Sequence, residues 1–194
     1  MSMVCSLRQA SDETIEHLRA HQEEIQFFLY GPESQPKPSF FARLFGKKEE
    51  PADTREWTPP AEDEEIYLDK AWNGLHYLFT LTDFDGEPPL CYLVKGGKEI
   101  GAVDVGYGPA RALSSAEVDA FYAALSAITP EELKARYDPQ KMMELSIYPT
   151  IWDRSEDPEE KDDPLDYLME YYAILMDFLR KSTEKRVGLI VYYN

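Results

Sequence analysis

Apolar residues recur along this chain mostly at the three-to-four spacing of an amphipathic helix, and in fewer places as short strand-like runs. The spacing and the start signals together predict helices at 11–29, at 68–80, at 114–128, from 129 onward, at 138–145 and from 163 onward. Short runs rich in aliphatic and aromatic residues predict strands at 3–7, 90–94, 100–105 and 187–193. A Lys-Gly-Gly-Lys sequence at 95–98 predicts a hairpin between the two middle strands.

Polar residues mark the start of several predicted helices. Ser114 with Glu117, and Thr129 with Glu132, form capping-box patterns, in which each side chain binds the main-chain N–H of the other residue. Asp163, directly before a proline, is typical of the residue that caps a helix. These signals are local, so they place helix starts without knowledge of the tertiary fold.

Strands near both ends of the sequence, with helices between them, predict one mixed sheet packed by several helices. A chain of 194 residues is most simply a single domain, so we expect an α+β domain over residues 1–194. Residues 31–65 interrupt the pattern, because prolines recur there and charged residues are frequent. We interpret this segment as an insertion on the domain.

Net charge excludes some classes of partner. The chain carries 37 acidic against 20 basic residues, a net charge of −17, whereas binding to nucleic acid needs clustered Lys and Arg. An anionic membrane surface is disfavoured for the same reason, and no apolar run approaches the ~18 residues of a membrane helix. No secretory signal pattern opens the sequence, and its two cysteines, Cys5 and Cys91, form no metal-binding or redox motif. We therefore expect a soluble cytoplasmic protein with two buried thiols.

Two acid-rich stretches, at 49–65 and 153–163, suggest a contact face for a basic protein. A solvated surface is the alternative interpretation of such runs. The residues expected to make these contacts are Glu62, Asp63, Glu64, Glu65, Asp153, Glu156, Asp157, Glu159 and Glu160.

A second hypothesis places a small-ligand or catalytic pocket around the third histidine. In it His76 acts as a base, Trp72 and Tyr107 form apolar walls, and Asp104 and Arg111 supply polarity. No nucleophile motif accompanies this set, and a hydrogen-bonded structural histidine is the alternative. The other two histidines, His17 and His21, lie one helical turn apart without the glutamate of a zinc protease motif. We predict no metal, no cofactor and no catalytic residue.

Several segments, in this order, resemble the YfbM-like family, a domain of unknown function (domain of unknown function 1877). They are 68–78, 100–113, 137–142, 147–152 and 167–178. The resemblance implies a bacterial α+β domain and no particular reaction. In that family a histidine often occupies the position of Asn73, so the resemblance gives no support to a two-histidine site.

The first functional hypothesis is therefore an acidic binding module, such as a cytoplasmic immunity protein that neutralises a basic toxin. The alternative is an enzyme or small-ligand sensor that uses the pocket around His76.

Overall fold

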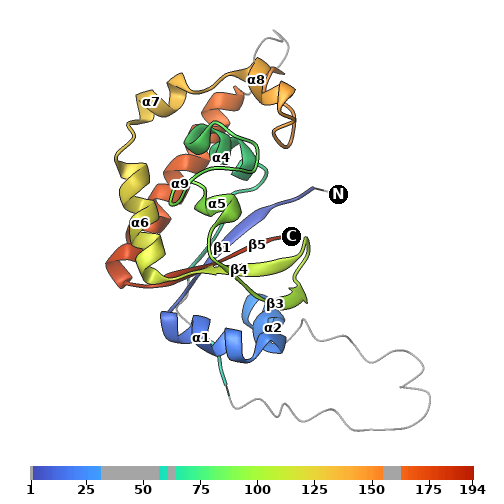
Figure 1. Ribbon diagram of the computed structural model, residues 1–194, viewed down its shortest axis with the longest axis vertical. Coiled ribbons are helices and arrows are strands. Elements are labelled where there is room, and N and C mark those ends of the chain that lie inside the picture. Colours follow the sequence, from blue (N-terminus) through green and yellow to red (C-terminus); the bar gives the residue numbers. More distant parts are fainter. Residues whose placement is uncertain (1, 32–56, 61–63, 155–162) are drawn as a thin grey trace, which may run out of the picture.

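Five strands of the described residues form one sheet in the order β2-β1-β5-β4-β3. The computed structural model describes residues 2–31, 57–60, 64–154 and 163–194. The strands are β1 (Cys5–Ala10), β2 (Glu65–Tyr67), β3 (Lys98–Asp104), β4 (Pro109–Leu113) and β5 (Gly188–Tyr193). β1 and β5 pair over their whole length, so the two ends of the chain lie side by side (Figure 1).

All four strand pairings are antiparallel, whereas the sequence predicts a mixed sheet. β5 lies in the middle, with Val191 opposite Leu7 of β1 on one side and opposite Arg111 of β4 on the other. The direction of a strand depends on where the preceding connection returns the chain, and side-chain spacing does not fix that direction. The prediction of an α+β domain is confirmed, and the direction of the strand pairing is corrected.

Helices cover both faces of the sheet. They are α1 (Asp12–Ala20), the 3₁₀ turn η1 (Gln22–Glu24), α2 (Ile25–Tyr30), α4 (Trp72–Thr80), α5 (Tyr92–Lys95), α6 (Ser115–Ser126), α7 (Pro130–Ala135), α8 (Pro139–Glu144) and α9 (Pro164–Lys185). In Figure 1, α7 and α8 lie at one end of the molecule, and α1 and α2 lie at the other.

Alternating residues of β5 divide the interior into two cores. Leu189 and Val191 belong to the larger core, with buried residues of α4, α6 and α9. Ile190 and Tyr192 point to the opposite face and pack with buried residues of α1 and α2. This alternation is the period of two that a strand covered on both faces requires.

α4 runs through the larger core, and every residue from Trp72 to Phe79 is buried. It begins four residues later than predicted, because the chain from Leu68 first turns along β1. There the Leu68 N–H donates to the Cys5 carbonyl at 2.8 Å, and Asp69 adopts a positive φ of 43°. Both predicted capping boxes are present at the starts of α6 and α7, and Asp163 caps α9.

The region from 88 to 113 differs most from the prediction. Residues 90–94, predicted as a strand, overlap the short helix α5 (Tyr92–Lys95), and Gly96 and Gly97 lead from that helix into β3. The hairpin lies further on, between β3 and β4, where Gly106 and Gly108 have positive φ values. Neither β4 nor β2 is predicted from the sequence. A five-residue apolar run satisfies both helix and strand templates, so tertiary contacts decide its conformation.

Two further expectations need smaller corrections. The helix predicted at 11–29 is split at His21 into α1, η1 and α2. The extended segment at 147–152 consists of turns that bury Trp152. Most of the predicted insertion, residues 32–56 and 61–63, lies outside the described residues.

Candidate functional site

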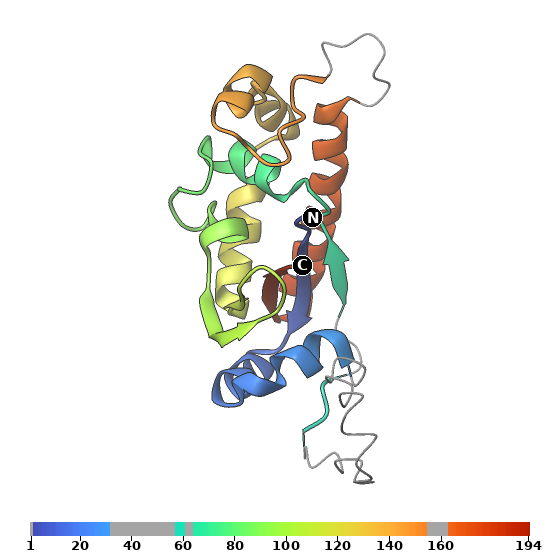
Figure 2. The ribbon, with the colours of Figure 1, turned by 90° about the vertical axis from the view of Figure 1, so that its right-hand side faces the viewer.

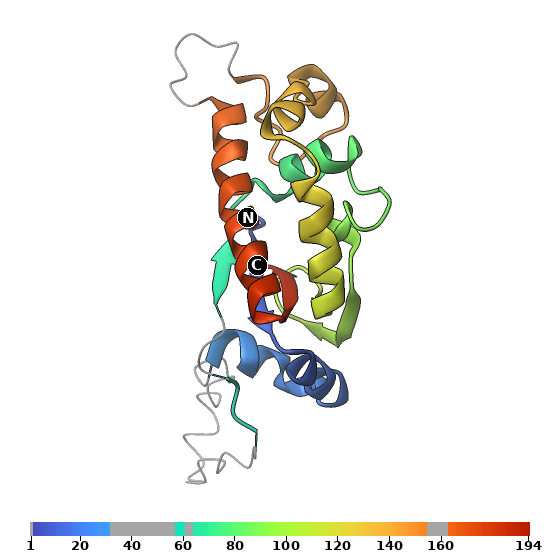
Figure 3. The same ribbon diagram turned by 90° about the vertical axis from the view of Figure 1, so that its left-hand side faces the viewer.

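A groove of about 360 Å³ lies between the outer strand β2 and the long helix α9. Figures 2 and 3 show these two elements next to each other at one side of the molecule. We call this hollow the edge groove. It is lined by Glu64, Ile66, Ala173, Ile174, Asp177, Phe178 and Lys181. Ile174 is 37% exposed, although its side chain is large and apolar. The groove thus combines apolar walls with charged residues in its lining.

The periodicities of the two elements produce this lining. Ile174, Asp177 and Lys181 lie three or four residues apart and so share one face of α9. Phe178 is buried beside that face, in the larger core. On β2, Ile66 lies opposite Leu7, a residue of the same core, whereas its neighbours point to the other face of the sheet.

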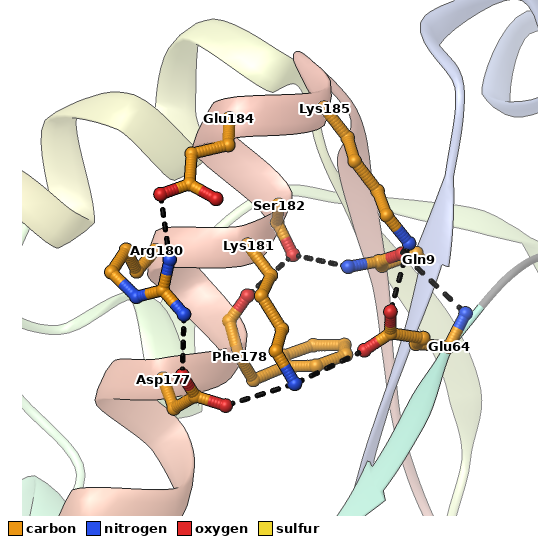
Figure 4. Close-up of polar contacts among 9 residues, drawn as sticks. All are labelled: Gln9, Glu64, Asp177, Phe178, Arg180, Lys181, Ser182, Glu184 and Lys185. Carbon is orange, nitrogen blue, oxygen red and sulfur yellow. Dashed lines mark hydrogen bonds and ion pairs between the residues drawn. The ribbon is translucent and has the colours of Figure 1, made fainter.

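A clamp of ion pairs joins the start of β2 to the last turns of α9 (Figure 4). The Glu64 carboxylate lies 2.9 Å from Lys185 Nζ and 3.7 Å from Lys181 Nζ. Lys185 also donates to the Gln9 side-chain oxygen, and the Gln9 amide donates to the buried Ser182 hydroxyl at 3.0 Å. Because Gln9 belongs to β1, the clamp links β1, β2 and α9.

Charges on α9 are distributed unevenly along its length. Asp166 and Glu170 lie in its first half without a basic residue, whereas its second half holds Arg180, Lys181 and Lys185 together with Asp177 and Glu184. Asp166 in the first turn and Lys185 in the last turn complement the helix dipole. Hydrogen bonding to Lys185 lowers the pKa of Glu64, and hydrogen bonding to Arg180 lowers that of Asp177. Both carboxylates of the groove therefore stay ionised at neutral pH.

Arg111, one of the residues predicted to form a pocket, binds main-chain carbonyl groups. Its guanidinium donates to the Leu93 carbonyl at 2.9 Å and to the Gly96 carbonyl. These carbonyls lie at the C-terminal end of α5, where carbonyls lack partners within the helix. Arg111, on β4, thus caps the C-terminal end of α5.

Asp104 and Tyr107 lie in the β3–β4 hairpin. One Asp104 carboxylate oxygen accepts the N–H groups of Gly106 and Gly108 at 2.8 and 3.1 Å, which holds the tight turn. The Tyr107 N–H donates to the Tyr193 carbonyl, and its side chain is 41% exposed. Asp104 is therefore engaged within its own turn.

His76 is completely buried in α4, and its Nε2 atom lies 2.9 Å from the Asp85 carbonyl. Its Nδ1 atom is buried without a hydrogen-bond partner. Burial lowers the pKa of this histidine and so favours its neutral form. Because a carbonyl oxygen can only accept, Nε2 is the nitrogen that carries the proton and donates to Asp85. Trp72 also lies in α4, where it stacks on Tyr148 and donates to the Met3 carbonyl.

The five residues of the predicted pocket line neither the edge groove nor the hollow that lies beside α1. His76 and Arg111 are close enough to interact electrostatically, whereas Asp104 and Tyr107 belong to the hairpin. The pocket stays a prediction.

The predicted acidic contact residues fall into two groups. Glu62, Asp63, Glu156, Asp157, Glu159 and Glu160 lie outside the described residues. Of the others, Glu64 belongs to the clamp, and Asp153 is exposed in the turn after Trp152. The Glu65 carboxylate accepts hydrogen bonds from Tyr67, at 2.9 Å, and from Tyr192. Two of these acids therefore also stabilise the β2 region.

A second hollow, of about 470 Å³, lies beside α1 and is lined by Ser11, Glu13, Thr14, His17, Trp57 and Pro60. The His17 ring stacks on Trp57 at 4.4 Å and packs near His21 at 4.7 Å. Its Nε2 atom lies 2.7 Å from a Glu24 carboxylate oxygen. Among the residues described, no group of three or more His, Cys, Asp or Glu side chains is placed to hold a metal ion.

The fold and the edge groove define an α+β domain with an antiparallel sheet between helices and an exposed apolar groove at one sheet edge. No described helix has the length and apolar character needed to cross a membrane. Residues 1–192 match the family model described as "Domain of unknown function (DUF1877)". The chain belongs to this family, as its resemblance in the sequence implied.

A solved structure supports the same fold. The crystal structure of a protein of unknown function, YfbM from Escherichia coli, is similar to 97% of this chain and 98% of its own, with a TM-score of 0.56. At 17% identity this likeness concerns the fold alone. Among curated proteins, no match to this chain is found.

Sequence reasoning missed the edge groove, although part of its signal was present. Ala173 and Ile174 extend the apolar stripe of α9 beyond the face that the core covers. The other wall depends on β2, which is three residues long and has one aliphatic side chain, Ile66. So short an element has no recognisable periodicity, because alternation needs about four residues to show.

Proposed function

We propose that this protein is a protein-binding module that contacts a basic polypeptide through the edge groove. The observation that carries the proposal is Ile174, an exposed large apolar side chain in a groove next to an outer strand. Apolar grooves with polar rims are typical of protein interaction sites. The charged side chains of this groove are paired with one another, because Lys181 binds both Glu64 and Asp177. They therefore favour a binding role for the groove over a catalytic one.

The net charge of −17 favours a basic partner. Long-range attraction accelerates the encounter of oppositely charged proteins, whereas two acidic proteins repel one another. An immunity protein that neutralises a basic toxin is the specific form of this function that we favour. The fold by itself gives no preference for that role, because one fold supports many functions.

Site-specific photo-crosslinking in native cells tests this proposal. A photoreactive phenylalanine analogue replaces Ile174 in one variant and Glu23, an exposed residue of η1, in the matched control. We expect a crosslinked protein of high isoelectric point from position 174 and none from position 23. The purified pair should associate more slowly as salt increases, because screening weakens steering. Equal crosslinking at both positions, or an acidic partner, would contradict the proposal.

A further inference from the structure

The main-chain hydrogen bonds of β2 are directed to one side only. The Gln9 N–H donates to the Glu64 carbonyl and the Leu68 N–H donates to the Cys5 carbonyl, both at 2.8 Å. With Ile66 in register with Leu7, these bonds show that residues 64, 66 and 68 turn their main-chain groups toward β1. The N–H and C=O groups of Glu65 and Tyr67 must therefore point away from the sheet.

No other strand of the described residues pairs with that outer side of β2. Such an edge is a template for another extended chain. The opposite edge strand, β3, is a poorer template, because its register shifts between Glu99 and Asp104. β2 is thus the regular edge of this sheet.

The edge groove lies directly beside the outer edge of β2, since Ile66 of β2 is part of its lining. Ile66 directs its side chain into the groove, so a strand added beside β2 would direct every second side chain toward Ala173 and Ile174. Its remaining side chains would lie on the other face, next to Tyr67, which is 55% exposed. An occupant with alternating apolar residues satisfies both the hydrogen bonds and the groove.

Charge decides between a second copy of this chain and a different partner. Each copy carries a net charge of −17, so two copies repel one another at long range. Glu170, exposed one turn before Ile174 and Ala173 on α9, attracts a basic residue of the occupant to that end of the groove. A basic extended segment therefore fits better than a second β2.

We propose that a basic partner binds by adding one of its segments as a strand alongside β2, with alternate apolar side chains in the edge groove. This inference rests on the proposed function and specifies its binding mode. Main-chain hydrogen bonds to Glu65 and Tyr67 supply affinity, and the groove selects the apolar residues.

A synthetic peptide tests the binding mode directly. The probe is a fluorescein-labelled octapeptide of alternating Lys and Ile, and the control is the same sequence with every main-chain nitrogen methylated. Fluorescence anisotropy should show saturable binding of the probe, and binding of the control at least about tenfold weaker, because it lacks donors. The control has the same charges and apolar side chains, so a purely electrostatic attraction would bind both equally.

Variants of the protein provide a second measurement. Proline is tolerated where an edge-strand N–H faces solvent, so Tyr67→Pro removes an outward donor and leaves the ladder to β1 intact. We expect Tyr67→Pro to weaken probe binding, and Glu23→Gln, at an exposed residue of η1 away from the edge groove, to leave it unchanged. Hydrogen exchange of the Ile66 amide reports whether the ladder survives in each variant. If Tyr67→Pro unfolds β2, the methylated peptide alone decides.

The outcomes separate this inference from the proposed function. Equal binding of both peptides, abolished by Ile174→Lys, would overturn strand addition and retain the groove as a binding face. Absence of binding by either peptide at low salt would also overturn strand addition, and the crosslinking experiment would then judge the proposed function independently.

Discussion

Lys185 Nζ lies 2.9 Å from the Glu64 carboxylate, so the last turn of α9 holds the residue that precedes β2. Gln9 shares this lysine through its side-chain oxygen. The shortest strand of the sheet is thus held from two directions, by its ladder to β1 and by a helix. This relationship determines how firmly the edge groove keeps its shape.

Replacing Glu64 with Gln should loosen β2 without unfolding the protein. The variant loses attraction to Lys181 and Lys185, but exposed ion pairs contribute little to global stability. We expect faster hydrogen exchange at the Ile66 amide and an almost unchanged free energy of unfolding. The matched control is Glu184→Gln, which removes a carboxylate that binds Arg180 within α9. Similar exchange in both variants would show that the clamp does not hold β2.

His76 should make the protein less stable as the pH falls through the range around 6.5. Burial lowers its folded-state pKa below the usual value of 6.5, so the unfolded chain takes up the proton first. Stability is therefore fully present above that pH and is lost as the pH decreases toward the folded-state pKa. Urea unfolding at a series of pH values should show this slope.

The variant His76→Gln should flatten that slope, because its amide can still donate to the Asp85 carbonyl but does not titrate. His21→Gln, which changes a histidine with a side chain 53% exposed, is the control and should retain the slope. Carboxylates titrate at lower pH, so their contribution appears in a separate range. An unchanged slope in His76→Gln would exclude this histidine as its source.

Arg111→Met should destabilise the fold by about 1.5–3 kcal/mol, the usual range for hydrogen bonds to charged groups. The substitution retains much of the apolar stem but leaves the Leu93 and Gly96 carbonyls without their donor. Chemical denaturation measures the loss, with the exposed Lys134→Met as control. A neutral result for Arg111→Met would argue that the cap on α5 is dispensable and would favour a functional role for the guanidinium.

Gly74→Ala should destabilise the larger core by about 1–3 kcal/mol through overpacking. A methyl group at this position would lie 2.6 Å from the Trp152 ring and 2.7 Å from Leu168. The variant Trp152→Phe has a smaller ring, so the two substitutions together should cost less than the sum of their separate effects. Strict additivity in this double-mutant cycle would contradict the contact.

Local signals explain the parts of the fold that the sequence predicted well. Ser114, Thr129 and Asp163 each bind a main-chain N–H within three residues, so their function needs no tertiary information. The long apolar stripe of α9 is likewise recognisable from the spacing of residues within that helix alone. The burial of Cys5 also agrees with the prediction, and burial raises the pKa of this thiol to about 12.

Pairings between distant segments explain the errors. β4 contains an arginine and begins with proline, so its sequence resembles a loop. It is recognisable as a strand only from its pairing with β5, in which Val191 lies opposite Arg111. The conformation of α5 depends in turn on the guanidinium of that same Arg111. No pattern within 90–94 contains this information.

The candidate site was only partly predictable for the same reason. Glu64 and Glu65 were identified by their charge, but their partners are Lys185 and Tyr192, far away in the sequence. Ile174 carries no recognisable signal in the sequence, because one exposed apolar residue on a helix is common and gains meaning only from the strand that lies next to it.

β5 joins the two halves of the sheet, β2-β1 on one side and β4-β3 on the other, yet it comes after the other four described strands in sequence order. During synthesis on the ribosome, the edges of β1 and β4 that pair with β5 therefore stay unpaired until residues 188–193 have left the exit tunnel. A nascent chain stalled before that point would expose two strand edges to neighbouring chains, and a chaperone that shields them should raise the yield of folded protein.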